Sequence, residues 1–412
     1  MAKSDTRSVL AIGAVDVTPL AASARRAGYD VYAVDYYGDQ DLEHSCVATL
    51  SFMKQGREEP CPGVFSNFIP EALLQLAKNL RRNYEIERSL LSSGLDDWPD
   101  ALVTLDDLVP ILGNTPEAFL KVRDKSKFFL ELERLGVAYP KTVIVRNLAE
   151  AKSVSKDLGF PLVLKPKEGC GGVSMRKASS LEELEGAFKS IHLRASGILL
   201  QEYVLGTHAS ASVMSVPGKA MTLAVSEQLL GRPEVGQREP FGYCGNIVPL
   251  SAPTQIMDKC RDVAERVVSH FGLIGTNGVD LVVSKEGTPH VIEVNPRFQG
   301  TIECVERVLG LNLVETHVKA CAERKLPAIS ERATRSCMRL VLFAKQRSVP
   351  PDLSAIKECR DVPAPGVVVR EGKPLCSMLI ENRDRRTMLK KAKQICRLIY
   401  SSLSSASSEG CI

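Results

Sequence analysis

Residues 290–300 read HVIEVNPRFQG, and this stretch decides the fold. It is an apolar, β-branched run that carries Glu293 and Asn295 at alternating positions. Because successive side chains of a strand point to opposite faces, these two oxygen donors share one face. Proline is excluded from strand interiors, so Pro296 is expected to end the strand. Arg297 follows directly after the end of the strand.

A second strand-like run lies just upstream, at residues 278–283 (GVDLVV), and carries Asp280. Residues 284–288 (SKEGT) read as the hairpin turn between the two runs. Folding back would set Asp280 beside Glu293 and Asn295. Three hard oxygen ligands, with positions left for phosphate and water, suit Mg²⁺. For any one of these residues alone, a solvated surface hairpin is the alternative.

Length and composition describe an ordinary globular protein. The 412 residues suffice for two or three domains, and 44% are hydrophobic and 25% charged. A net charge of +4 is too weak to argue for a nucleic-acid partner. The twelve cysteines form neither a CxxC pair nor a Cys/His pattern, which disfavours zinc and predicts free thiols in a reducing compartment.

The sequence gives no sign of a membrane partner. It contains no apolar run of ~18 residues that could form a span. The first seven residues, MAKSDTR, lack the apolar core of a signal peptide. We therefore expect a cytoplasmic protein.

The N-terminal region alternates strands and helices. Residues 8–13 and 29–35 read as strands, with a helix over 19–27 capped by Thr18 between them. This order predicts a parallel sheet with helical crossovers. Asp35 ends the second strand, as in dinucleotide-binding domains, but residues 13–18 (GAVDVT) lack GxGxxG, which argues against NAD.

The rest of this region reads as a helix over residues 71–91 and a strand over 99–105. Residues 112–116 (LGNTP) then break the pattern, and the domain boundary is placed there.

A lysine inside an apolar strand marks a second candidate site. Lys165 lies in residues 160–166 (FPLVLKP), and burying an ammonium group without a partner is expensive. A triphosphate is such a partner, whereas a lysine that extends from an edge strand into solvent is the alternative. The glycine-rich stretch 168–174 (EGCGGVS) follows and allows backbone N–H groups to approach phosphate closely.

Taken together, Asp280, Glu293, Asn295 and Arg297 resemble the signature end of the ATP-grasp superfamily, which includes biotin carboxylase, carbamoyl phosphate synthetase and D-alanine–D-alanine ligase. The resemblance implies that the first three residues hold one or two Mg²⁺ (or Mn²⁺) ions on the phosphates of ATP. It also implies that Arg297 faces the transferred phosphate or the substrate.

The same resemblance assigns the nucleotide contacts. Lys125 and Lys165 would contact the ATP phosphates, and Gln201 stands where relatives carry an acid for the adenine amino group. The implied lid is formed by Glu168, Gly169, Gly171 and Gly172, and the implied hinge backbone by Glu202, Tyr203 and Val204. His208 falls where many relatives place a ribose-binding acid, and a structural loop histidine is the alternative. Residues 35–41 (DYYGDQD) resemble a loop of carboligases related to biotin carboxylase.

We therefore predict an α/β protein, α+β in its grasp region. A Rossmann-like N-terminal domain spans residues 1–113, the ATP-grasp domain 114–325, a small β-rich C-terminal subdomain 326–400 and a disordered tail 401–412. The basic helix expected over residues 382–398 reads as a solvated face rather than a nucleic-acid patch.

The resemblance implies an ADP-forming carboxylate–amine ligase that works through an acyl phosphate, with Arg297 and Lys165 as catalytic residues. Its partners would be a small-molecule carboxylate and an amine. Dimers are common in the family, so a homodimer is also implied. Two alternatives stay open: a biotin-independent carboxylase that uses bicarbonate through carboxyphosphate, and a non-catalytic ATP-binding protein.

Overall fold

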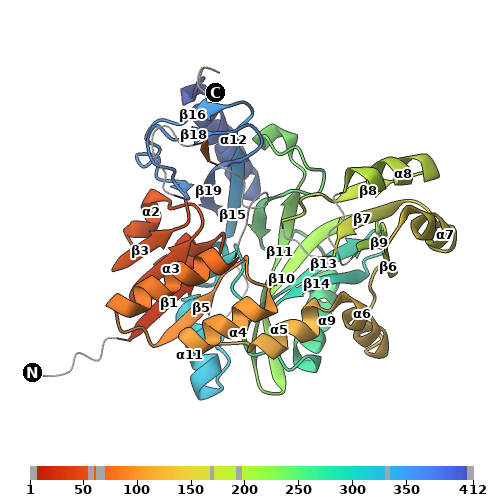
Figure 1. Ribbon diagram of the computed structural model, residues 1–412, viewed down its shortest axis with the longest axis horizontal. Helices are drawn as coiled ribbons and strands as arrows, with labels where there is room; N and C mark the ends of the chain where they lie inside the picture. Colours follow the sequence, from red (N-terminus) through yellow and green to blue (C-terminus); the bar gives the residue numbers. More distant parts are fainter. Residues whose placement is uncertain are drawn as a thin grey trace, which may run out of the picture.

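The computed structural model describes residues 7–53, 60–61, 70–167, 171–191, 197–329 and 335–405. Figure 1 shows the N-terminal α/β layer on one side, a long curved sheet through the middle and a small α/β subdomain at the opposite end. Within the described residues, no helix combines the length and the apolar character needed to cross a bilayer.

The N-terminal layer is a parallel sheet in the order β3-β2-β1-β5. Its elements are β1 (Ser8–Ile12), α1 (Val17–Arg26), β2 (Asp30–Asp35), α2 (Gln40–Glu43), β3 (Ala48–Ser51), α3 (Pro70–Asn83), β5 (Arg88–Leu91) and α4 (Pro99–Leu108). Buried aliphatic side chains of β1, α3 and α4 form one core beneath it. The predicted parallel sheet with helical crossovers is confirmed.

Three local predictions in this layer were wrong. Helix α1 begins at Val17 after Asp16, so Thr18 lies inside the helix and does not cap it. Residues 99–105 form helix α4 and not a strand, because Pro99 occupies its first turn and Ala101, Leu102 and Leu105 are buried at helical spacing. The helix predicted over 71–91 ends at Asn83, since Arg88–Leu91 forms β5, the edge strand that pairs with β1.

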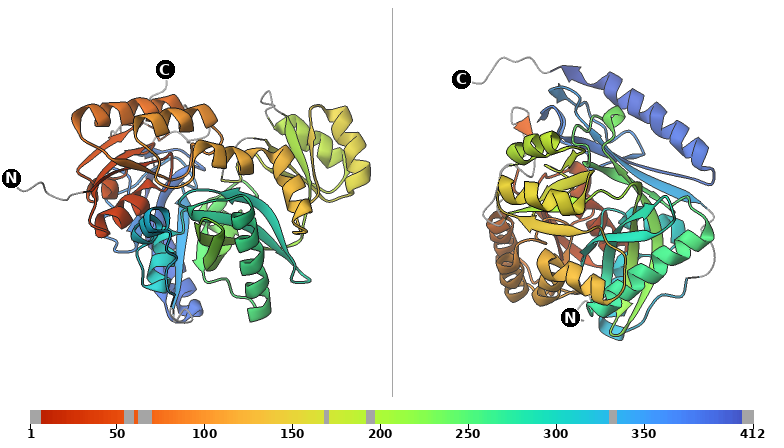
Figure 2. Two further views of the ribbon diagram at one scale, coloured as in Figure 1. Left: turned by 90° about the horizontal axis from the view of Figure 1, so that it is seen from below. Right: turned by 90° about the vertical axis from the view of Figure 1, so that its right-hand side faces the viewer.

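The small α/β subdomain is a sheet in the order β6-β9-β7-β8 that carries two helices on one face. It comprises β6 (Thr142–Val145), α7 (Leu148–Leu158), β7 (Leu162–Pro166), β8 (Arg176–Ala178), α8 (Leu181–Ser190) and β9 (Ile198–Glu202). Figure 2 shows it standing apart from the N-terminal layer, joined through α5 (Pro116–Arg123) and α6 (Lys125–Arg134). This subdomain carries Lys165 on β7 and Gln201 on β9.

The central sheet has the order β14-β13-β10-β11-β12-β15-β19-β17. Its strands are β10 (Gly206–Val216), β11 (Lys219–Leu230), β12 (Tyr243–Val248), β13 (Gly275–Ser284), β14 (Pro289–Asn295), β15 (Ser336–Phe343), β17 (Cys359–Arg360) and β19 (Pro374–Asn382). The helices packed with it are α9 (Thr254–His270), α10 (Ile302–Leu309) and α11 (Leu313–Glu323), and a short helix, η1, spans Pro233–Val235. The antiparallel β13–β14 pair is the hairpin predicted around Asp280 and Glu293.

The C-terminal part continues the central sheet, because β12 pairs with β15. A second small sheet, β20-β16-β18-β4, contains Ser404–Ser405, Ser348–Val349, Val368–Val369 and Pro60–Cys61. Helix α12 (Arg385–Ser402) runs beyond the boundary expected at residue 400, so the expected tail, residues 401–412, begins inside this helix and β20. Residues 406–412 are not among the residues that the structure describes.

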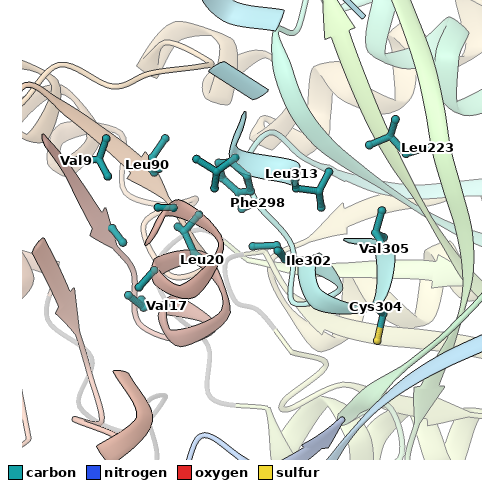
Figure 3. Packing of buried hydrophobic residues seen from close by; sticks show 14 of the residues in the cluster. Val9, Val17, Leu20, Leu90, Leu223, Phe298, Ile302, Cys304, Val305 and Leu313 are labelled. Carbon is teal, nitrogen blue, oxygen red and sulfur yellow. The ribbon is translucent and has the colours of Figure 1, made fainter. Parts of the chain in front are cut away.

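The N-terminal layer is fixed to the central sheet by a mixed apolar and polar contact of α1. Figure 3 shows Val17 and Leu20 of α1 in the same core as Ile302. Beside it, the Ser23 hydroxyl donates to Oε1 of Glu306 at 2.5 Å. This contact holds the two layers at a fixed spacing.

A buried histidine makes a second connection between the layers. His317 accepts a hydrogen bond at Nδ1 from the Thr276 amide (2.9 Å), and its Nε2 lies 2.9 Å from the Leu112 carbonyl. Its ring packs on Phe298, with centroids 4.7 Å apart. Burial lowers the pKa of His317 to about 4. The ring is therefore neutral in the folded protein at neutral pH.

We predict that His317→Gln flattens the acid limb of the stability curve. The folded-state pKa lies below the unfolded value of roughly 6.5, so stability is fully present above pH 6.5 and is lost as the pH falls toward 4. Over that window the wild type should lose roughly 3 kcal/mol more than the variant in urea unfolding. His44→Gln, at an exposed histidine, is the control. Parallel curves for wild type and His317→Gln would contradict this role.

Candidate active site

A cavity of about 420 Å³ opens between the N-terminal layer, the central sheet and the small α/β subdomain. Every described residue predicted for the site lines it: Lys125, Lys165, Gly171, Gly172, Gln201, Glu202, Tyr203, Val204, His208, Asp280, Glu293, Asn295 and Arg297. Glu168 and Gly169 lie outside the described residues.

Two carboxylates and an amide meet on the β13–β14 hairpin. Asp280 stands opposite Glu293 in the strand register, and the Asn295 amide donates to Oδ2 of Asp280 at 3.2 Å. Burial, and then the charge of Glu293, raise the pKa of Asp280. Because the two carboxylates lie close together and repel each other, a cation between them is favourable. Carboxylate and amide oxygens are the ligands that Mg²⁺ prefers, so this donor set fits that ion.

Sequence reasoning missed Gln228 of β11. Its Nε2 donates to Oδ1 of Asp280 at 3.0 Å. This bond and the Asn295 bond together orient the Asp280 carboxylate. The partner strand lies far away in the sequence, so no local pattern signals this contact.

Cations gather on the other side of Glu293. Its Oε2 lies 3.4 Å from Nζ of Lys125 and 3.7 Å from Nη1 of Arg123. Burial opposes ionisation of Glu293, but Lys125 and Arg123 outweigh it and lower its pKa. Lys125 begins α6 and Arg123 ends α5, so the break between the two helices turns both cations toward one acid.

Lys165 is a buried cation with a neutral partner. Only 8% of the residue is exposed, and its Nζ donates to Oε1 of Gln201 at 3.2 Å. Burial, and then the charge of Lys125, lower the pKa of Lys165 to about 8. Among the described residues, no carboxylate lies within ion-pair distance of it. An anionic ligand would supply the charge that this ammonium lacks.

The hinge after β9 presents polar groups beside apolar ones. Gln201 is buried, and its Nε2 donates to the Thr142 hydroxyl at 2.6 Å. In the described part of the chain, the Val204 amide makes no hydrogen bond and remains available to a ligand. Val163 and Leu199 line the cavity nearby and suit the flat face of a base.

His208 lies in strand β10 and not in a loop, so the alternative of a structural loop histidine was wrong. It pairs with Val282 of β13 and lines the cavity. Burial lowers its pKa. Its ring makes no hydrogen bond within the described residues, which leaves the ring nitrogens available.

The glycine-rich segment lies against β12. The Tyr243 amide donates to the Gly171 carbonyl at 3.0 Å. Gly172 has φ +71°, and a Cβ there would lie 1.9 Å from the Phe241 carbonyl oxygen. This close backbone contact requires glycine at position 172.

Two acids that follow β5 hold the two arginines of the site. Arg297 donates through Nε to Asp96 (2.9 Å), and Arg123 donates through Nε to Asp97 (2.7 Å). Burial opposes ionisation of Asp96, but the charge of Arg297 outweighs it and lowers its pKa. Sequence reasoning missed these residues. The available signal was an Asp pair at the carboxyl end of a buried parallel strand, where ligand sites collect.

A comparison with known protein families agrees with the geometry of this site. Residues 122–301 match the family model described as "ATP-grasp domain". This segment is an ATP-grasp domain. It contains Lys125, Lys165 and the whole Asp280–Arg297 set. The predicted superfamily and fold class are therefore confirmed.

Curated relatives of this chain are distant in sequence. An uncharacterized protein of Methanocaldococcus jannaschii is 22% identical over 367 residues, covering 89% of this chain and 86% of that protein. The carbamoyl phosphate synthase large chain of Pseudomonas aeruginosa is 26% identical over 223 residues, covering 54% of this chain. This chain spans only 20% of that synthase.

Solved structures share the fold over nearly the whole length of this chain. A biotin carboxylase–ATP-analogue complex from Campylobacter jejuni has a TM-score of 0.73 and 18% identity, covering 97% of this chain and 92% of that one. An ADP complex of N5-carboxyaminoimidazole ribonucleotide synthetase has a TM-score of 0.71 and 14% identity, covering 98% and 100%. The likeness extends the match beyond residues 122–301 at the level of fold.

We predict that Lys165→Met weakens binding of Mg·ATP about 10- to 100-fold, because a charge-assisted hydrogen bond is worth roughly 1.5–3 kcal/mol. Titration calorimetry with a non-hydrolysable ATP analogue measures this. Without nucleotide, the thermal midpoint of the variant should be unchanged or higher, because a buried charge is removed. Lys156→Met, on the exposed face of α7, is the control. Equal affinity in both variants would refute a phosphate contact of Lys165.

Proposed function

We propose that this protein is an ATP-dependent carboxylate–amine ligase that forms ADP and phosphate through an acyl phosphate. The observation that carries the proposal is one cavity in which the buried Lys165 and Arg297, whose side chain is 9% exposed, flank the Asp280, Glu293 and Asn295 oxygens. Phosphoryl transfer needs cationic side chains next to a set of oxygen ligands that can bind a metal ion.

Asp280, Glu293 and Asn295 would hold Mg²⁺ (or Mn²⁺), which neutralises charge on the phosphate oxygens of ATP when bound. The raised pKa of Asp280 supports this role, since a divalent ion relieves the repulsion between the two acids.

Lys125 and Lys165 would hold the phosphates, each with a different balance of charge. Lys125 already forms an ion pair with the Glu293 carboxylate, whereas Lys165 is hydrogen-bonded to the neutral Gln201. Lys165 therefore gains more from an arriving phosphate and is the stronger candidate for contact with the transferred group.

The nucleoside would lie between the small subdomain and the central sheet. The Val204 amide is placed to donate to the base, and Oε1 of Gln201 keeps a lone pair for the adenine amino group. We assign His208 to the ribose, since its ring lines the cavity without another partner in the described chain. Gly171 and Gly172 would cover the phosphates.

Arg297 would stabilise the charge that develops as the carboxylate attacks the γ-phosphoryl group. It is 9% exposed at its side chain, and Asp96 fixes its orientation through Nε. Its Nη1 donates to the Phe298 carbonyl at 2.8 Å. The amine then attacks the acyl carbon, and the products are an amide and inorganic phosphate.

The test is ADP release from Mg·ATP with pooled carboxylates and amines, with bicarbonate as a separate arm. We expect release to require both an acid and an amine. Glu293→Gln should lose at least about 100-fold in rate, on the scale of removing one transition-state contact. Glu286→Gln, in the exposed turn of the same hairpin, should keep wild-type rate.

Each other outcome selects another function. Release with bicarbonate and no organic acid would make the protein a carboxylase that forms carboxyphosphate. ATP binding without release in any arm would make it a nucleotide-binding protein. Either result would overturn the ligase proposal.

We predict that Asp96→Asn lowers kcat about 10-fold while the KM for ATP changes less than about 3-fold, because Arg297 loses its orientation and not its charge. Asp100→Asn, exposed in the first turn of α4, is the control. If KM rose with kcat unchanged, Asp96 would serve ground-state binding of ATP instead.

The homodimer and the cytoplasmic location remain predictions. A biotin carboxylase domain from Hydrogenobacter thermophilus, a structural relative with 14% identity, is described as a dimer. Analytical ultracentrifugation of this protein would determine its oligomeric state.

A further inference from the structure

The cavity has a second half beyond the phosphate-binding end, between the N-terminal layer and strands β15, β18 and β19. Its apolar wall consists of Val341, Phe343, Val367, Val369, Leu375 and Cys376. Acids from the N-terminal layer and from the segment after β17 face it: Asp16, Asp39 and Asp361. The phosphate end is rich in cations, so the two ends differ in charge.

Asp16 lies close to the reacting end of this half. It precedes α1 in the left-handed conformation (φ 61°), and its side chain does not cap the helix. Instead, Oδ1 lies 2.9 Å from Nη1 of Arg339. A Cβ on Gly300 would lie 2.9 Å from Oδ2 of Asp16, so the carboxylate lies against the segment that follows Arg297.

One arginine serves two acids here. Nη2 of Arg339 lies 2.6 Å from Asp361, and Nη1 donates to the Gly300 carbonyl at 3.0 Å. Arg339 is only 3% exposed. Burial opposes its charge, but Asp361 and Asp16 outweigh burial and raise its pKa far above the usual value. One positive charge shared by two carboxylates leaves an excess of negative charge.

A hydroxyl without a partner in the described chain lies in the same half of the cavity, independently of the acids. Thr18 of α1 is 7% exposed and lines this half of the cavity. In the described part of the chain its hydroxyl has no hydrogen-bond partner. The hydroxyl is therefore open to the cavity, where a polar group of a ligand can bond to it.

We propose that this second half binds the acceptor as a primary ammonium on an apolar skeleton, with no anionic group near the nitrogen. Asp16 and Asp361 hold the ammonium, Thr18 accepts one of its hydrogens, and the wall around Phe343 and Leu375 covers the skeleton. The excess of carboxylates repels anionic acceptors. The inference rests on the ligase function proposed above and names the class of its amine.

The test uses pairs of probes that share a skeleton and differ in charge. Phenethylamine is compared with 3-phenylpropanoate, and hexylamine with heptanoate, by calorimetry on the full chain loaded with Mg²⁺ and a non-hydrolysable ATP analogue. We expect the ammonium member of each pair to bind at least about 10-fold more tightly than the carboxylate member, because it gains a charge-assisted hydrogen bond.

Asp16→Asn should remove that preference. Asparagine tolerates the left-handed backbone as well as aspartate does, so the variant is expected to fold. Its affinity for the ATP analogue should match the wild type. Asp30→Asn, a half-exposed acid at the start of β2 that pairs with Arg25 outside the cavity, should keep the preference.

In the binding experiments, three results would overturn the inference: binding of neither member of either pair, equal or tighter binding of the carboxylates, or an unchanged preference in Asp16→Asn. Failure of the ligase function gives a different result, namely no ADP release in any arm with probe binding intact. Conversely, ADP release that needs an amine bearing a carboxylate would sustain the ligase and reject this acceptor class.

Discussion

The contact of Glu293 with Lys125 and Arg123 is the interaction on which the rest of the site depends. It joins the end of β14 to the break between α5 and α6, which lie about 170 residues earlier in the chain. The Glu293 side chain is 28% exposed, whereas Lys125 is buried, so the lysine is stable there only because the carboxylate compensates its charge. The pair therefore fixes the helix junction relative to the hairpin, and with it the space available to phosphate.

Charge is arranged in sequence along the cavity. Lys165 and Lys125 lie at the end that we propose for phosphate, Asp280 and Glu293 form the central oxygen set, and Asp16 and Asp361 lie at the far end. Arg297 lies at the transition, tied to Asp96 of the N-terminal layer. The N-terminal domain is thus part of the site, since it supplies an acid that orients Arg297 and another that faces the acceptor half.

The sequence allowed prediction of those parts of the site that local patterns encode. The β13–β14 hairpin is contiguous, and its alternation placed Asp280, Glu293 and Asn295 together correctly. The parallel N-terminal sheet followed from its strand–helix order. Helix α4 was missed because a short apolar run such as residues 101–105 fits either period.

Contacts across the chain could not be predicted in the same way. Asp96 meets Arg297 across 201 residues, and Arg339 joins Asp16 of the N-terminal layer to Asp361. Gln228 reaches Asp280 from a strand that is not its neighbour. Each pairing depends on how separate layers pack, and one sequence carries no record of that packing.

The central claim is that a carboxylate of the substrate attacks the γ-phosphorus of ATP. The most direct measurement is the fate of ¹⁸O in a doubly labelled carboxylic acid that supports turnover, read by ³¹P NMR of the phosphate produced. An acyl phosphate requires one carboxylate oxygen to leave with phosphorus, so we predict one ¹⁸O in each inorganic phosphate together with ADP. Unlabelled phosphate, or label found in AMP, would contradict the account.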